Sequence, residues 1–115
     1  MIRIGAPLLC LAVASCAAPA PTLGDARAHA YEGDRAAALR AVEQVILVGP
    51  SAEAYRLRGR LRLVEGRARG ALEDARRALA LDPFDGESHC LMAEALLDAG
   101  DLEAAVAAAS CAIRY

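Results

Sequence analysis

Three glycines divide the chain at a nearly constant interval. Gly33, Gly66 and Gly100 stand 33 and 34 residues apart. Each lies between two runs in which apolar and small residues recur at helical spacing. Self-similarity at such a period is typical of repeat proteins, in which one small unit is copied and stacked. The interval therefore predicts stacked helical pairs rather than a single globular core.

Small residues fall in register when the chain is aligned on this period. The three copies span about 19–51, 52–85 and 86–115. Gly59 in the second copy aligns with Ala93 in the third, and Ala71 aligns with Ala105. Two helices approach to about 8 to 10 Å only where their facing side chains are small. We therefore expect Ala71 to face Gly59, and Ala105 to face Ala93.

Local signals set the expected ends of the helices. Pro50 and Pro83 cannot continue a helix. Asp34 and Asp101 follow glycines and can cap the next helix. The segment 45–48 is β-branched enough to be a short strand, although it also completes an apolar helical face. The expected helices are 22–32, 35–48, 52–65, 68–81, 86–99 and 102–114.

The pattern resembles the tetratricopeptide repeat (TPR), a helix-turn-helix unit of about 34 residues. The matching residues are Tyr55, Gly59, Ala71, Ala78 and Pro83. The resemblance implies an all-α, right-handed superhelical solenoid of about three repeats that binds other proteins. Arg58, Arg62 and Ala75 stand where the family has leucine, tyrosine and phenylalanine. We therefore expect a thinner core between the helices of the second repeat.

The first residues predict export from the cytoplasm. Arg3 precedes an apolar stretch, 6–14, that is shorter than the roughly 20 residues needed to span a bilayer. The residues that end at Cys16 resemble a bacterial lipobox, which implies cleavage between Ser15 and Cys16 and lipidation of the Cys16 thiol. Two alternatives are an ordinary secretory signal with a coincidental cysteine and an uncleaved anchor over 4–21, although the latter contains three prolines.

The lipoprotein resemblance also predicts an address and a domain layout. Ala17 stands where an aspartate would favour retention at the inner membrane, which implies an outer-membrane lipoprotein that faces the periplasm. The segments are a signal peptide at 1–15, a lipidated tether at 16–24 and the TPR-like domain at 25–115.

In the TPR family the first helix of each pair lines a concave groove, and the resemblance therefore implies a set of binding residues on these helices. They are Arg27, Tyr31, Arg56, Arg60, Glu94 and Asp98, with Cys90 on the same face. The second repeat is basic and the third is acidic, so a peptide of complementary charge could lie across both. The alternative is that these arginines only solvate a helix and pair with nearby acids. The family's carboxylate clamp uses asparagine, which this chain lacks.

The last expected helix carries apolar residues that a following helix would cover. They are Leu102, Val106, Ile113 and Tyr115. We expect this face to dock on a protein partner or on a second copy, forming a homodimer. The alternative is a frayed last helix.

The sequence offers little chemistry for catalysis. His29 and His89 have no nucleophile or acid at motif spacing, and His89 aligns with Tyr55 as a packing residue. No metal-ligand cluster or phosphate-binding loop is visible, so no cofactor is expected. Cys90 and Cys111 are expected on opposite flanks of their helix pair, unsuited to a disulfide. A chain that begins at Cys16 would hold 12 arginines and 15 acidic residues, a net charge near −3, and nothing in this balance suggests nucleic-acid binding.

Together these features predict a non-enzymatic, lipid-anchored periplasmic protein that mediates protein–protein interaction. Its resemblance to repeat lipoproteins points to pilus, secretion or other cell-envelope assembly. The alternative is a regulatory accessory subunit of an envelope or cell-wall enzyme.

Overall fold

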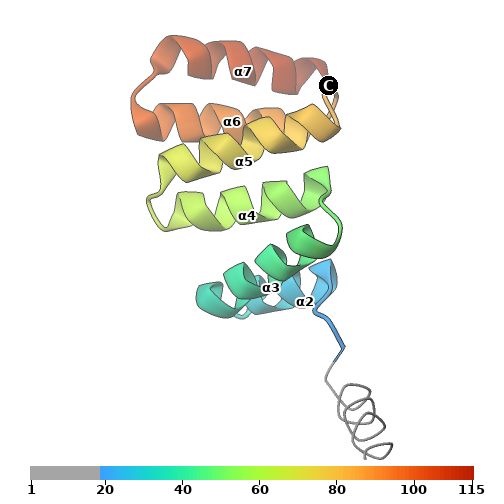
Figure 1. Ribbon diagram of the computed structural model, residues 1–115. Coiled ribbons are helices and arrows are strands. Elements are labelled where there is room, and N and C mark those ends of the chain that lie inside the picture. Colours follow the sequence, from blue (N-terminus) through green and yellow to red (C-terminus); the bar gives the residue numbers. More distant parts are fainter. Residues whose placement is uncertain (1–18) are drawn as a thin grey trace, which may run out of the picture.

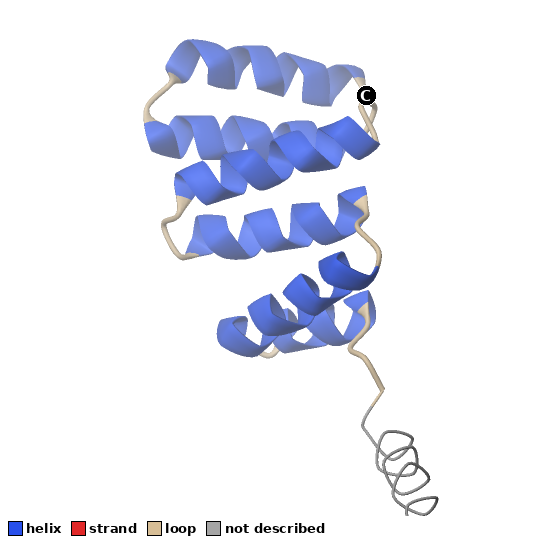
Figure 2. Cartoon of the chain, viewed as in Figure 1, coloured by secondary structure: helices blue, strands red, loops and turns tan. Residues whose placement is uncertain are grey.

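A computed structural model describes residues 19–115, which form six α-helices and no strand. The helices are α2 (Leu23–Tyr31), α3 (Arg35–Val48), α4 (Ala52–Val64), α5 (Ala68–Leu81), α6 (Gly86–Ala99) and α7 (Leu102–Arg114). They stack as three helix pairs, with α2 and α3 at one end and α7 at the other (Figure 1). Short loops join them (Figure 2). The expected helices are confirmed to within two residues, and the strand alternative at 45–48 is wrong.

The helices begin where the local sequence offers a cap. Thr22 and Asp25 form a capping box, in which the Asp25 backbone N–H donates to Thr22 and the Thr22 backbone N–H donates to the Asp25 carboxylate. Because of this box, α2 begins at Leu23, inside the range 16–24 that the sequence assigns to the tether. Asp34 and Asp101 cap α3 and α7 as expected.

The interval of three glycines is explained by backbone geometry. Gly33, Gly66 and Gly100 have φ angles of +86°, +80° and +88°, and they are the residues with positive φ in the described part of the chain. A side chain is strained in this left-handed region, so glycine closes the first helix of each pair.

Small residues lie at the helix crossings. A Cβ atom added to Gly59 would lie 3.4 Å from the Ala71 carbonyl oxygen, and 2.6 Å from a terminal methyl of Leu91. Ala93 and Ala105 belong to one buried cluster. The expected approach of Gly59 to Ala71 is therefore confirmed, and Ala93 and Ala105 lie in one cluster, as facing residues would.

The second repeat differs from expectation between α4 and α5. Asp74 is completely buried, and both arginines that replace the family's apolar residues reach it. Arg58 donates from Nε and Nη2 at 2.8 to 3.2 Å, and Arg62 donates from Nη1 at 3.0 Å. Burial alone would lower the pKa of Arg58, but the hydrogen bonds and charge of Asp74 outweigh it and raise that pKa. The core here is charged rather than thin.

The predictions at the N-terminus lie outside the described residues. They are the signal peptide at 1–15, the cleavage site between Ser15 and Cys16, and the lipidation of Cys16. Among the helices of residues 19–115, none combines the length and the hydropathy required of a membrane span.

Candidate functional site

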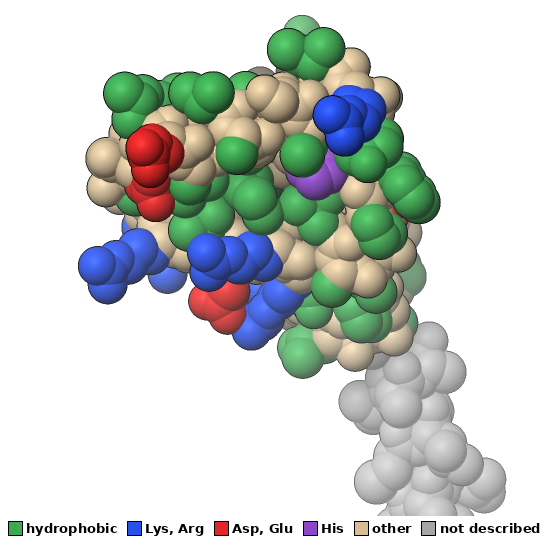
Figure 3. Space-filling view, turned by 90° about the horizontal axis from the view of Figure 1, so that it is seen from above, with side chains coloured by type: hydrophobic (Ala, Val, Ile, Leu, Met, Phe, Trp, Pro, Cys, Tyr) green, Lys and Arg blue, Asp and Glu red, His purple; other side chains and the backbone are tan. Residues whose placement is uncertain are grey.

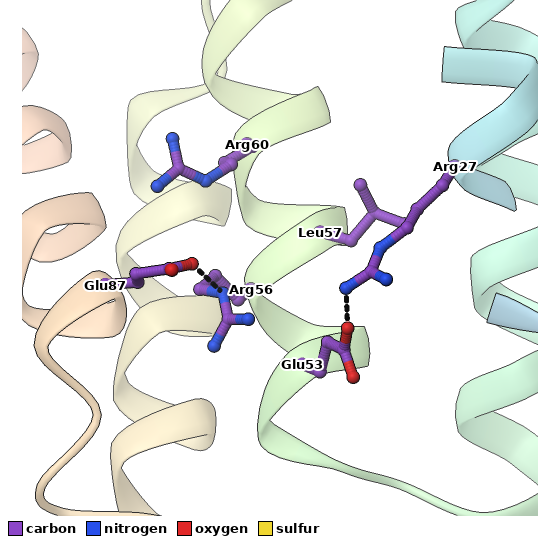
Figure 4. Close-up of a pocket in the computed structure, with 6 residues that line it drawn as sticks. All are labelled: Arg27, Glu53, Arg56, Leu57, Arg60 and Glu87. Carbon is purple, nitrogen blue, oxygen red and sulfur yellow. Dashed lines mark ion pairs between the residues drawn. The ribbon is translucent and has the colours of Figure 1, made fainter. Parts of the chain in front are cut away.

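Side chains from α2, α4 and α6 converge on one pocket of about 170 Å³. Its lining residues are Arg27, Glu53, Arg56, Leu57, Arg60 and Glu87. Figure 4 shows the three arginines approaching from two helices, with Leu57 between them. The first helices of three successive repeats therefore share one site, and three of the six predicted groove residues meet there.

Two of the three arginines already have carboxylate partners. Arg27 pairs with Glu53, and both side chains are about half exposed. Arg56 lies deeper, where it pairs with Asp85 and, through Nε at 3.1 Å, with Glu87. The alternative that these arginines pair with neighbouring acids is therefore observed for Arg27 and Arg56.

Asp85 makes the Arg56 contact part of the scaffold. Its carboxylate caps α6 by accepting from the Glu87 backbone N–H at 3.2 Å, and it also accepts from the Ser88 hydroxyl at 2.6 Å. Partial burial alone would raise the pKa of Asp85, but the bonds from Ser88 and Arg56 outweigh burial and lower the pKa below its ordinary value. Arg56 thus fastens α4 to the start of α6.

Arg60 differs from the other two arginines of the pocket. Its side chain is exposed, and among residues 19–115 it takes part in no ion pair. A guanidinium at the edge of a concave surface can bind a carboxylate with two parallel hydrogen bonds. Arg60 is therefore the residue of this pocket best placed to bind an anionic group.

A second, more apolar pocket of about 290 Å³ lies further along α6. Its lining residues are Cys90, Ala93, Glu94, Ala109, Ala112 and Ile113. Glu87 of the first pocket precedes Cys90 by three residues, and Glu94 follows Cys90 by four, so all three share one face of α6. The two pockets therefore follow one another along a single helix.

The remaining predicted groove residues are more dispersed. Glu94 lines the second pocket, and Asp98 is exposed one turn beyond it. Tyr31 is 95% exposed at the end of α2 and lines neither pocket. Arg27, Arg56 and Arg60 therefore lie together in the first pocket, and Glu94 and Asp98 lie further along α6. Tyr31 belongs to neither pocket.

Sequence reasoning missed the acidic residues of the first pocket. Glu53 and Glu87 stand 34 residues apart, one repeat period, and each pairs with an arginine of the groove. This recurrence was visible in the sequence and could have identified them.

His89 and the two cysteines of the repeat domain lie outside the first pocket. His89 Nε2 lies 3.0 Å from the Pro83 carbonyl oxygen, and its ring lies 5.6 Å from that of Tyr115. Cys90 and Cys111 are free thiols that line different pockets. Within the part of the chain that the structure describes, no three histidine, cysteine or carboxylate side chains are grouped to hold a metal ion.

The comparisons with known proteins concern the fold. No family model matches the chain, and no curated protein matches its sequence. Among solved structures, the crystal structure of MamA, a TPR-like protein, matches with a TM-score of 0.76 and 19% identity. The match covers 80% of this chain and 54% of that of MamA, so the chain spans about half the length of that structure.

At this identity the likeness defines a fold class only. Six helices in three stacked pairs, with a TPR-like structural neighbour, form an all-α helical-repeat solenoid. The fold predicted from the glycine interval is therefore confirmed.

Proposed function

We propose that this protein is a non-enzymatic scaffold that binds an extended segment of another protein along α4 and α6. The observation that carries the proposal is the groove itself. In the described part of the chain it offers Arg60 without an ion-pair partner in the first pocket, and an apolar pocket with two carboxylates further along α6. Within residues 19–115, Glu94 and Asp98 take part in no ion pair. Among the described residues, the groove therefore offers an unpaired guanidinium at one end and unpaired carboxylates at the other.

This polarity defines the ligand. An acidic side chain would bind Arg60, an apolar side chain would fill the pocket that Cys90 and Ile113 line, and a basic side chain would lie near Glu94 and Asp98. Arg27 and Arg56 would contribute hydrogen-bond donors rather than net charge, because Glu53, Glu87 and Asp85 already compensate both guanidinium groups.

The cellular setting of the proposal rests on the sequence. Cys16 would carry the lipid, residues up to the start of α2 would form the tether, and the groove would face the periplasm from the outer membrane. In that position the scaffold would act in pilus, secretion or other envelope assembly.

The experiment is crosslinking in intact cells of a Gram-negative host that expresses the full chain. Arg60→Glu should reduce recovery of the crosslinked partner at least tenfold, about 1.4 kcal/mol of binding free energy. Arg40→Glu, a charge reversal at an exposed arginine of α3, should leave recovery unchanged. Arg60 is the better test residue, because reversal of Arg56 would also disturb the Asp85 contact.

The anchor is tested separately with Cys16→Ser. Loss of the partner with this variant, together with loss of lipidation by mass spectrometry, would support the envelope assignment. Equal recovery with Arg60→Glu and Arg40→Glu would rule out the groove. A recovered cell-wall enzyme would support the regulatory-subunit alternative instead of assembly.

A further inference from the structure

Helix α7 has two dissimilar faces. It packs on α6 through Ala105 and Ala108, which are buried in the same cluster as Ala93 and Leu96. On the other side Leu102, Val106 and Ile113 are 66%, 61% and 88% exposed. Among residues 19–115, no element covers this side of α7, and Figure 3 shows hydrophobic side chains gathered on it.

Charges of opposite sign stand at the two ends of the exposed face. Glu103, Ala107, Ser110 and Arg114 follow one another at spacings of four, three and four residues, so they form one stripe, and all four are exposed. Figure 3 shows acidic groups at one end of this surface and a basic group at the other. Within the described residues, neither Glu103 nor Arg114 takes part in an ion pair.

This arrangement is complementary to its own copy. We propose that a second copy of the chain packs its α7 antiparallel to the first, about a two-fold axis that passes between residues 108 and 109. Glu103 of each copy then lies opposite Arg114 of the other, because the two residues are equally far from the axis. The face is self-complementary, as a two-fold interface must be.

The middle of the stripe permits close approach. Ala107 of one copy faces Ser110 of the other near the axis, and such small side chains allow two helices to pack at about 8 to 10 Å. The exposed Leu102, Val106 and Ile113 line one flank of each helix. A two-fold axis perpendicular to the two antiparallel helices keeps both apolar flanks on the same side of the seam, where the two flanks adjoin each other.

The size of the face sets the strength of the pair. A stable interface usually buries about 1,200 to 2,000 Å² in total, and a single helix from each copy provides less. The dimer should therefore form reversibly, at micromolar or higher concentration. Ile113 also lines the second pocket of the groove, whereas Glu103 and Arg114 line neither groove pocket. A charge exchange at Glu103 and Arg114 therefore tests this inference separately from the proposed function.

The test is a charge exchange in the full chain, followed by sedimentation equilibrium over a wide concentration range. Glu103→Arg and Arg114→Glu should each raise the dimer dissociation constant at least tenfold, because each places like charges opposite one another. The double variant exchanges both ends and should return within about threefold of wild type. Helicity measured by circular dichroism should be the same for all variants.

Matched controls separate the pairing from nonspecific association. Glu32→Arg and Arg40→Glu change exposed charges on the first repeat and should leave the dissociation constant unchanged, as should Arg60→Glu in the groove. A wild-type chain that stays monomeric throughout the concentration range would overturn the proposal. So would single variants that associate like wild type, or a double variant that stays as weak as the singles.

Discussion

The second and third repeats share one backbone design but fill their cores differently. Counted 34 residues on, the positions of Arg58, Arg62 and Asp74 hold Met92, Leu96 and Ala108. Between α4 and α5, two arginines converge on a buried carboxylate. Between α6 and α7, the equivalent positions belong to an apolar cluster. The comparison shows that the repeat period dictates where side chains meet without dictating their chemistry.

The two cores hold their helices by different forces. The charged core uses directional hydrogen bonds, and Arg58 also lies over the Tyr55 ring, 5.5 Å from its centroid. The apolar core is stabilised by burial of small apolar side chains, and the hydrophobic effect has no preferred direction. Removal of charges from water costs free energy that the ion pairs only partly offset. We therefore expect that loss of one charged partner lowers the stability of the second repeat strongly, and that replacement of the whole charged cluster by apolar residues can raise it.

The largest effect is expected from Asp74→Ala. This change leaves the Arg58 and Arg62 guanidinium groups largely buried without their partner, and loss of one partner of a buried ion pair costs about 3 to 5 kcal/mol. Chemical denaturation should show the loss. Glu73→Ala, the neighbouring acid, breaks only an exposed pair with Arg77 and should change stability by about 0.5 kcal/mol or less. Similar losses for both variants would contradict the buried cluster.

A smaller change in stability, of opposite sign, is expected when the three core residues of the second repeat are replaced by those of the third. The triple variant Arg58→Met, Arg62→Leu and Asp74→Ala replaces the charged cluster by the residues found one period later. Replacement of a buried ion cluster by apolar residues is often neutral or stabilising by about 1 to 4 kcal/mol. We expect the triple variant to regain the Asp74→Ala loss and exceed wild type in denaturant unfolding. A triple variant as unstable as Asp74→Ala alone would show that the two cores are not interchangeable.

The contrast also explains which features the sequence could predict. Helix limits were predictable because prolines, left-handed glycines and aspartate caps act on neighbouring residues. The role of Asp74 was not, because its partners lie 12 and 16 residues earlier on another helix. Arg58 and Arg62 at positions of the helix interface were the available signal, but two arginines do not by themselves identify which acid of the facing helix will pair with them.

The same reasoning applies to the groove. The repeat register nominated Arg27, Arg56 and Arg60, which do meet in one pocket. The register could not predict which of the three is available to bind a ligand, because that depends on which carboxylates pair with each arginine in the folded chain. Among residues 19–115, Arg60 is the arginine of this pocket that makes no ion pair, whereas Arg56 is paired with Asp85.

The smallest predicted loss of stability concerns the contact between α4 and the start of α6, which Asp85 makes. Asp85 caps α6, and Ser51, one period earlier, caps α4 by accepting from the Ala54 backbone N–H at 3.1 Å. Asp85→Ser therefore keeps a capping side chain but removes the ion pair with Arg56. Hydrogen bonds to charged groups contribute about 1.5 to 3 kcal/mol, and the retained cap reduces the expected loss to about 1 kcal/mol at pH 7.

The pH dependence separates this ion pair from the cap. Because the pKa of Asp85 is lowered by folding, its contribution is fully present above the unfolded pKa of about 3.9 and is lost as the pH falls through the folded pKa. The stability difference between wild type and Asp85→Ser should therefore be constant from about pH 7 to pH 5 and shrink as the pH falls below about 4. Thermal unfolding of both proteins across this range measures it. A difference that stays constant at low pH would assign the whole effect to capping, and the α4–α6 joint would then resemble the joint at Ser51.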